Sequence, residues 1–131
     1  MAETFDPHKD KFDLHQGATL RRNYQWLVDD IANDISDFVE IRSQFRWGYS
    51  DADPVFDLTE ANGGIVRVSD NNGEFQLHIT DELSTAVVPN STCDPNVSKW
   101  PMVFDIEMVH SDGDVIRIIQ GTAQFYREAT R

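Results

Sequence analysis

Hydrophobic and polar residues alternate most regularly near the carboxyl end of the chain. Between residues 102 and 108, every second position is apolar, which indicates a strand with one buried face; Val103 and Val109 are apolar exceptions on the other face. The stretch 111–114 reads Ser-Asp-Gly-Asp and has turn chemistry, because glycine adopts positive φ readily. Residues 115–126 are rich in β-branched side chains. We therefore predict an antiparallel hairpin at the centre of the fold, whose second strand bends near Gly121. The apolar positions of its first strand are Met102, Phe104, Ile106 and Met108.

Similar alternation, bounded by turn residues, recurs along the rest of the chain. In the strand predicted at 38–47, we expect Val39, Ile41 and Phe45 to face the core, with Ser43 interrupting the pattern. The pattern gives eight or nine strands and at most one or two helical turns, which is typical of an all-β fold, an antiparallel β-sandwich. The further strands are predicted at 12–14, 19–28, 55–58, 65–68 and 74–79.

Two stretches break the strand pattern. Residues 29–37 contain isoleucines spaced four apart, as in a short helix, among aspartates and asparagines that favour loops. We interpret them as a loop. Thr80 is a typical helix N-cap and is followed by two acidic residues, so we predict a single helical turn there. We expect Leu83, Ala86 and Val87 on that turn to face the core.

Length and charge limit the classes of protein to consider. A chain of 131 residues suits one domain, with a flexible polar tail at 1–10 and a single folded domain at 11–131. The net charge of −12 disfavours binding to nucleic acid or to an anionic membrane surface. No apolar run approaches the roughly 20 residues of a membrane-spanning helix, and no signal peptide is recognisable.

Residues suited to catalysis or metal binding are sparse. The four histidines lie on separate predicted elements without metal-binding spacing, and Cys93 is the single cysteine, so no intrachain disulfide forms. The pairs Asp51/Asp53 and Asp112/Asp114 have oxygen atoms suited to Ca²⁺ but lack the twelve-residue calcium-loop pattern, and we interpret Asp112 and Asp114 as hairpin-loop residues. Nucleophile and phosphate-binding motifs are missing too. We expect no enzyme activity, no metal and no cofactor; a hydrolase with a carboxylate pair remains an alternative.

The aromatic residues allow a second hypothesis. Trp47 and Trp100 are suited to stacking on sugar rings, as in a carbohydrate-binding module for host attachment. We favour the simpler interpretation that both tryptophans anchor the core at strand positions.

Four segments, in this order along the chain, carry a resemblance to a known family. They are FDLHQGAT (12–19); DISDFVEIRSQFR (34–46); LTEANGGI (58–65) with GEFQLHI (73–79) and STA (84–86); and FDIEM (104–108) with DG (112–113), VIRIIQGT (115–122) and ATR (129–131). Together they resemble small bacteriophage virion proteins, which are tail or baseplate components akin to the N-terminal domain of the baseplate upper protein. The resemblance covers roughly residues 11–131, and Asp37 stands where the family usually has glycine.

The resemblance implies an immunoglobulin-like sandwich without catalytic residues. It also implies a structural role in the phage tail, as a baseplate component or a fibre-to-baseplate adaptor, in several symmetric copies beside other tail, baseplate or fibre proteins. The protein would be made in the bacterial cytoplasm and built into the virion. On this view Arg21, Arg22, Arg42 and Arg46 are expected to anchor contacts with acidic neighbouring copies, because arginine is enriched at interfaces; solvated strand faces are the alternative.

Overall fold

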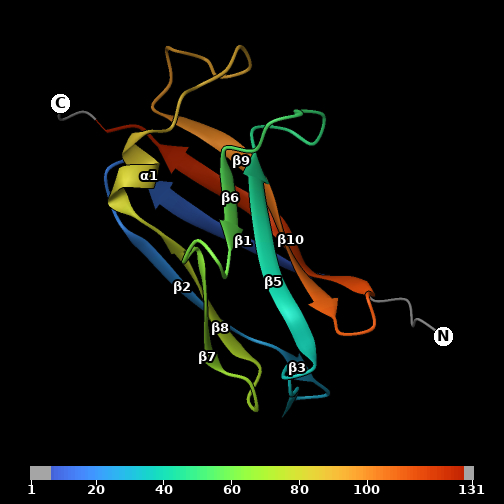
Figure 1. Cartoon of the computed structure of the whole chain (residues 1–131). Coiled ribbons are helices and arrows are strands. Elements are labelled where there is room, and N and C mark those ends of the chain that lie inside the picture. Colours follow the sequence, from blue (N-terminus) through green and yellow to red (C-terminus); the bar gives the residue numbers. More distant parts are fainter. Residues whose placement is uncertain (1–6, 129–131) are drawn as a thin grey trace.

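The computed structural model describes residues 7–128, which form two packed β-sheets and one short helix (Figure 1). The five-stranded sheet has the order β1-β10-β9-β5-β6, the three-stranded sheet has the order β2-β8-β7, and β3 pairs with β4 in a small hairpin. This is the predicted all-β sandwich with an immunoglobulin-like arrangement of strands. The elements are β1 (His8–His15), β2 (Leu20–Gln25), β3 (Leu27–Val28), β4 (Ile31–Ala32), β5 (Phe38–Arg46), β6 (Phe56–Thr59), β7 (Ile65–Ser69), β8 (Glu74–Ile79), α1 (Asp81–Thr85), β9 (Lys99–His110) and β10 (Val115–Tyr126).

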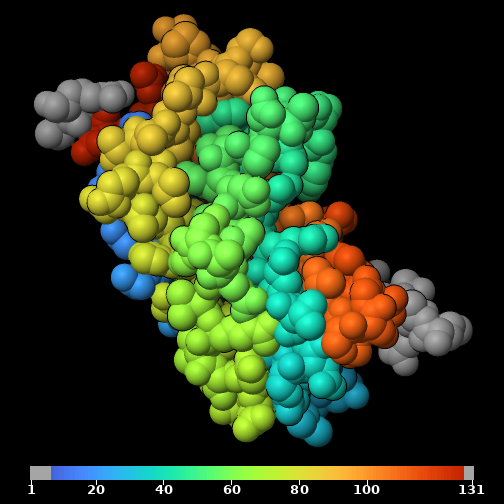
Figure 2. Space-filling model, viewed as in Figure 1, coloured from blue at the N-terminus to red at the C-terminus, as the bar shows by residue number. Residues whose placement is uncertain are grey.

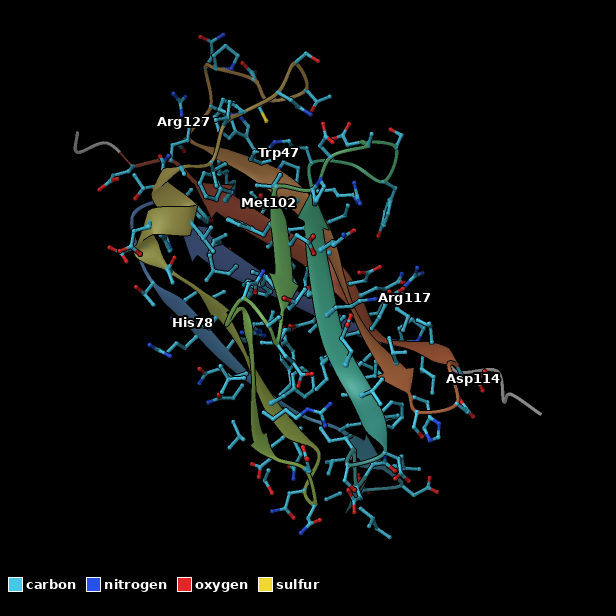
Figure 3. The ribbon with its side chains drawn as sticks, in the orientation of Figure 1. Trp47, His78, Met102, Asp114, Arg117 and Arg127 are labelled. Carbon is cyan, nitrogen blue, oxygen red and sulfur yellow. The ribbon has the colours of Figure 1, made fainter. Side chains whose placement is uncertain are left out.

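The hairpin β9–β10 lies at the centre of the larger sheet, as predicted. Its inward side chains pack between the two sheets, where Figure 3 shows Met102. Phe45 of β5 stacks on Phe104 at 4.8 Å between ring centroids, and Phe12 of β1 meets both rings edge-on. Each buried phenylalanine stabilises the fold by roughly 1.5–3 kcal/mol. This aromatic cluster joins three strands that lie far apart in sequence.

Among the described strands, β1 and β10 form the single parallel pair. Gly121 lies opposite Asp10, and a Cβ atom at Gly121 would overlap the carbonyl oxygen of Asp10. The glycine is therefore required by the close approach of β1. The irregularity that we expected near Gly121 lies earlier, between Arg117 and Ile119, where a β-bulge places both Ile118 and Ile119 in the core.

Bulges and turns account for several wrong predictions. A bulge between Phe38 and Glu40 turns Val39 outward, and its side chain is 64% exposed. Ser43 is buried instead and donates a hydrogen bond to the carbonyl oxygen of Asp105 at 2.6 Å. Residues 29–37, expected as a loop, begin with a tight turn between β3 and β4, in which Asp29 and Asp30 have φ of 51° and 65°.

The structure corrects two further predictions, one about the helical turn α1 and one about the N-terminal tail. Thr80 caps α1 as predicted, and Val87 packs against the core as expected, but Leu83 and Ala86 are exposed and the buried residue of the helix is Ser84. The Ser84 hydroxyl accepts a hydrogen bond from the Gly17 N–H and donates one to the carbonyl oxygen of Ala18. The tail predicted at 1–10 is too long, because residues 8–10 belong to β1; its first six residues lie outside the described part of the chain.

Candidate interaction surfaces

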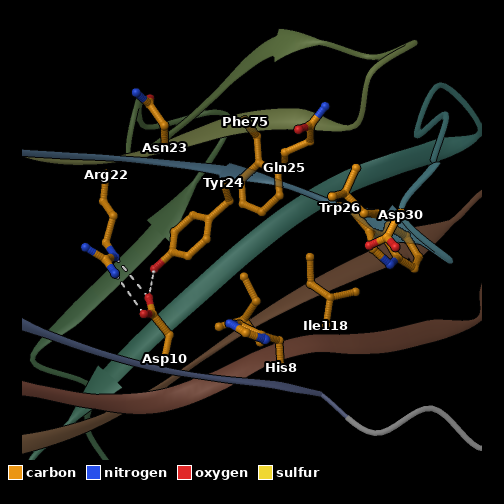
Figure 4. Close-up of a pocket in the computed structure, with 12 residues that line it drawn as sticks. His8, Asp10, Arg22, Asn23, Tyr24, Gln25, Trp26, Asp30, Phe75 and Ile118 are labelled. Carbon is orange, nitrogen blue, oxygen red and sulfur yellow. Dashed lines mark hydrogen bonds and ion pairs between the residues drawn. The ribbon is translucent and has the colours of Figure 1, made fainter. Parts of the chain in front are cut away.

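A pocket of about 750 Å³, here called the edge pocket, opens between β1 and β2 (Figure 4). These two strands are edge strands of different sheets, so the pocket lies on one open side of the sandwich. Its inner wall is apolar and includes Trp26, Phe75 and Ile118. Asp10 and Arg22 lie at its end nearest the β1–β2 connection, and their side chains point toward one another in Figure 4.

Asp10, Arg22 and Tyr24 form a compact polar cluster in this pocket. The Arg22 guanidinium donates two hydrogen bonds to the Asp10 carboxylate, at 2.9 and 2.8 Å, and the Tyr24 hydroxyl donates a third at 2.6 Å. The guanidinium also lies 4.7 Å from the centroid of the Phe12 ring. Bidentate charge-assisted bonds of this kind are among the stronger hydrogen bonds in proteins. The cluster therefore ties β1 of one sheet to β2 of the other.

Protonation states in the cluster follow from this geometry. Burial acts to raise the pKa of Asp10, but the hydrogen bonds from Arg22 and Tyr24 and the positive charge of Arg22 outweigh it, so the pKa lies below the ordinary aspartate value. Burial, together with the hydrogen bond to Asp10, raises the pKa of Tyr24 far above its ordinary range. At neutral pH the carboxylate stays charged and the phenol stays protonated, which suits a structural tie better than proton transfer.

Arg67 performs the matching role on the opposite open side. Its guanidinium donates hydrogen bonds to the carbonyl oxygens of Ile35 at 3.1 Å and Phe38 at 2.5 Å. It also forms ion pairs with Glu60 and Asp70. One inward-facing arginine thus closes each open side of the sandwich.

The arginines predicted as interface anchors do not form one cluster. Arg22 lies between the sheets and its guanidinium is already paired with Asp10 within the chain. That it anchors contacts with neighbouring copies stays a prediction. Arg21 lies on the exposed outer face of the three-stranded sheet and donates to the Gln76 side chain at 3.3 Å.

Arg42 and Arg46 lie on the outer face of the five-stranded sheet, and both are already bound. Arg42 pairs with Glu107 of β9 at 3.1 Å and with Glu40 at 3.6 Å. Arg46 donates to the backbone carbonyl oxygens of Asp51 at 2.8 Å and Ala52 at 2.7 Å, and so holds the loop that follows β5. These contacts use the guanidinium groups within the chain.

The same outer face has a row of charges across three strands. Arg117 of β10, labelled in Figure 3, lies 3.3 Å from Asp105 and 3.9 Å from Glu107. Burial raises the pKa of Asp105, and the nearby charge of Glu107 raises it further. Exposed pairs of this type add at most about 1 kcal/mol each to stability. The main effect of these ion pairs is to fix the pattern of charge on this face, and their contribution to the stability of the fold is small.

Exposed apolar side chains gather at the end of the sandwich that contains the β3–β4 hairpin. Val28 and Ile31 flank the hairpin turn and are 47% and 71% exposed. On the adjoining outer sheet face, Val109 lies opposite Val115, beside the bulge that turns Val39 outward; Val39, Val109 and Val115 are here called the valine patch. Figure 2 shows the hairpin projecting at the lower end of the molecule.

The two tryptophans of the sugar-stacking hypothesis pack against each other. Trp100 is 6% exposed, and its indole N–H donates to the carbonyl oxygen of Asp94 at 2.7 Å. Trp47 is half-buried and meets Trp100 at an interplanar angle of 90°. Two perpendicular rings, one of them buried, do not form a flat platform for a sugar. Trp100 is a core anchor.

Residues 7–128 contain no group of three or more His, Cys, Asp or Glu side chains placed to bind a metal ion. Asp112 accepts a hydrogen bond from the backbone N–H of Asp114 and so stabilises the hairpin turn. Cys93 is buried. Within the same residues, no helix is long and apolar enough to cross a membrane.

Sequence reasoning missed Asp10, Tyr24 and Arg67. The sequence does contain a signal for Asp10 and Tyr24, because Arg22 interrupts an apolar strand face. An arginine that faces inward requires a carboxylate or carbonyl partner. Asp10 falls in the predicted tail, so the sequence pattern does not indicate it as this partner. Arg67 occupies the same kind of position in β7, between two outward valines.

The fold and these surfaces define an immunoglobulin-like β-sandwich with several exposed contact surfaces. No protein-family model matches the sequence, and no curated protein matches it significantly. One similar solved structure is ACE19, the collagen-binding subdomain of the surface protein ACE of Enterococcus faecalis. It is 15% identical, the alignment covers 82% of this chain and 87% of that one, and the TM-score is 0.25. Similarity at this level says nothing about what this chain binds.

Proposed function

We propose that this protein is a structural component of a bacteriophage tail, in the baseplate or between fibre and baseplate, and that it acts through protein–protein contacts. The observation that carries the proposal is the order of the four family-like segments. They fall on β1 and its following turn, on β5 and the segment leading into it, on β6 to α1, and on β9–β10; residues 129–131 of the fourth segment lie outside the described part of the chain. These are successive elements of one immunoglobulin-like sandwich, which is the fold that the resemblance implies.

The end with the β3–β4 hairpin is the best candidate contact surface. Ile31 and the valine patch expose apolar area there, and exposed apolar patches with polar rims are typical of protein–protein interfaces. The surrounding loops contain exposed aspartates, which favour a partner with basic residues around an apolar surface. These aspartates are Asp29, Asp30, Asp34, Asp37, Asp112 and Asp114.

Purified phage particles test the proposal directly. Quantitative mass spectrometry should detect the protein in fixed stoichiometry with tail proteins, and carbodiimide cross-linking should join aspartates of this end to lysines of a neighbouring subunit. The substitution Val39→Asn should reduce incorporation, whereas Val68→Asn, at 59% exposure on the other sheet, should not. Absence of the protein from purified particles would refute the proposal.

A further inference from the structure

A second pocket, of about 480 Å³, lies at the opposite end of the sandwich from the β3–β4 hairpin. It is here called the end pocket. The loop after β5 forms one wall, and α1 with the segment that follows it forms the other. Figure 3 labels Trp47 beside that loop. The pocket is separate from the edge pocket, with which it shares no lining residue.

The lining of the end pocket combines an aromatic and aliphatic surface with negative charge. Trp47 contributes its indole, and among residues 7–128 the charged groups of the lining are the carboxylates of Asp51 and Asp53, with no lysine, arginine or histidine. Leu83 and Val88 are 46% and 77% exposed, so the apolar walls are open to a ligand. The remaining lining residues are Ala52, Pro54, Val55, Ala86, Val87 and Asn90.

Hydrogen bonds hold the two walls in place before any ligand arrives. Arg46 donates to the carbonyl oxygens of Asp51 and Ala52, which fixes the loop from outside the pocket lining. The Asn90 amide donates to the Asp51 carboxylate at 3.2 Å and links one wall to the other. The backbone N–H of Val55 donates to the carbonyl oxygen of Phe45, which joins the end of the loop to β5. A preformed site loses less entropy on binding.

We propose that the end pocket binds a long basic side chain, arginine or lysine, presented by a partner protein. The aliphatic stem of such a side chain packs on apolar surface while its charged head stays near water. Here the stem would lie on Leu83 and Val88, and the head would reach Asp51 and Asp53 through charge-assisted hydrogen bonds. The indole of Trp47 adds an attraction for the cation. The net charge of −12 attracts a basic partner from a distance.

This inference deepens the proposed function by naming the chemistry of one contact. It relies on that function only for the identity of the partner, since the pocket itself is tested on the isolated protein. Absence from phage particles would leave the pocket inference standing, and failure of the pocket test would leave the tail proposal standing.

The test is a titration followed by ¹H–¹⁵N NMR, in which the indole N–H of each tryptophan gives a separate signal. N-acetyl-arginine methylamide is compared with N-acetyl-citrulline methylamide, which has nearly the same shape without the charge, at matched chloride concentration. The Trp47 signal should shift in a saturable way with the arginine compound, with millimolar affinity, and at least fivefold more weakly with citrulline. Trp26, in the edge pocket, serves as the internal reference and should not shift.

Charge variants decide the origin of the shift. Asp53→Asn should weaken arginine binding about threefold to tenfold, whereas Asp13→Asn, an exposed aspartate on β1, should leave it unchanged. A well-dispersed spectrum confirms that each variant is folded. Equal binding of citrulline, no saturable shift of Trp47, or unchanged binding by Asp53→Asn would overturn the proposal. Saturable binding of methyl glucoside at Trp47 would assign the pocket to sugars and overturn it equally.

Discussion

Removing the carboxylate charge of Asp10 should loosen the sandwich on its β1–β2 side. Asp10→Asn keeps the size of the side chain but weakens the two hydrogen bonds from Arg22 and the one from Tyr24. It also leaves the guanidinium between the sheets without its counter-charge. The variant should fold to the same topology with lower stability, because the apolar core does not depend on this pair.

The loss of folding free energy caused by Asp10→Asn should lie between two limits. Breaking a fully buried ion pair costs roughly 3–5 kcal/mol, and breaking an exposed one costs roughly 0.2–1 kcal/mol. The Asp10 side chain is 11% exposed, but that of Arg22 is 35% exposed, so water partly replaces the lost partner. We expect a loss of about 2 kcal/mol, which for a domain of this size lowers Tm by about 7 °C.

The effect should depend on pH in a defined direction. Because the pKa of Asp10 in the folded protein lies below its ordinary value of 3.8, ionisation of Asp10 favours folding above that value. This contribution is lost as the pH falls through the lower, folded-state pKa. The stability difference between the natural protein and Asp10→Asn should therefore be constant from pH 5 to 7 and shrink below about pH 4.

Urea unfolding followed by tryptophan fluorescence, at pH 7 and at pH 3, measures both effects. Asp13→Asn is the matched control, since Asp13 lies on the same strand but faces outward, and it should change stability by less than about 0.5 kcal/mol. Equal losses in the two variants, or a difference for Asp10→Asn that persists undiminished at pH 3, would refute the role assigned to the cluster.

Three further substitutions test other contacts by the same unfolding measurement. Gly121→Ala should cost about 3 kcal/mol, because its Cβ would force β1 away at Asp10; an unchanged midpoint would show that β1 is loosely held. Ser84→Ala should cost about 1–3 kcal/mol, because it leaves a backbone N–H and a carbonyl of the β1–β2 turn without their partner. Arg67→Lys should cost about 1–3 kcal/mol despite keeping the charge, because an ammonium cannot reproduce the fork that reaches two carbonyl oxygens; a neutral result would mean that charge alone suffices.

The fold was predictable wherever one face of a strand is buried against the other sheet. Strict alternation predicts the bounds of β8 as observed and those of β9 and β10 to within one residue. A shift of one position in either strand would expose Phe104 or Leu77 to solvent. The cap at Thr80 was predictable as well, since its hydrogen bond to the Leu83 N–H is local in sequence.

The remainder depended on contacts that local sequence does not encode. The bulge beside Val39 shifts the register by one residue, and it is fixed by β9, far along the chain. Two consecutive aspartates with positive φ form the β3–β4 turn, where glycine or asparagine would be expected. Residues 8–10 lack apolar alternation, because Asp10 faces inward only through its partners Arg22 and Tyr24. The pockets arise from the packing of separate loops and strands, which a pattern along one strand cannot show.

The parallel pairing of β1 with β10 also has a consequence for how the protein is made. Its partners, from His8 with Ile119 to His15 with Tyr126, are more than a hundred positions apart. The strand β1, which is synthesised first, therefore cannot form this pairing until β10 has been synthesised. Folding that depends on such distant contacts is slow. A nascent chain stalled before residue 115 would expose the edge of β9 as well as unpaired β1, so incomplete products are prone to aggregation and degradation.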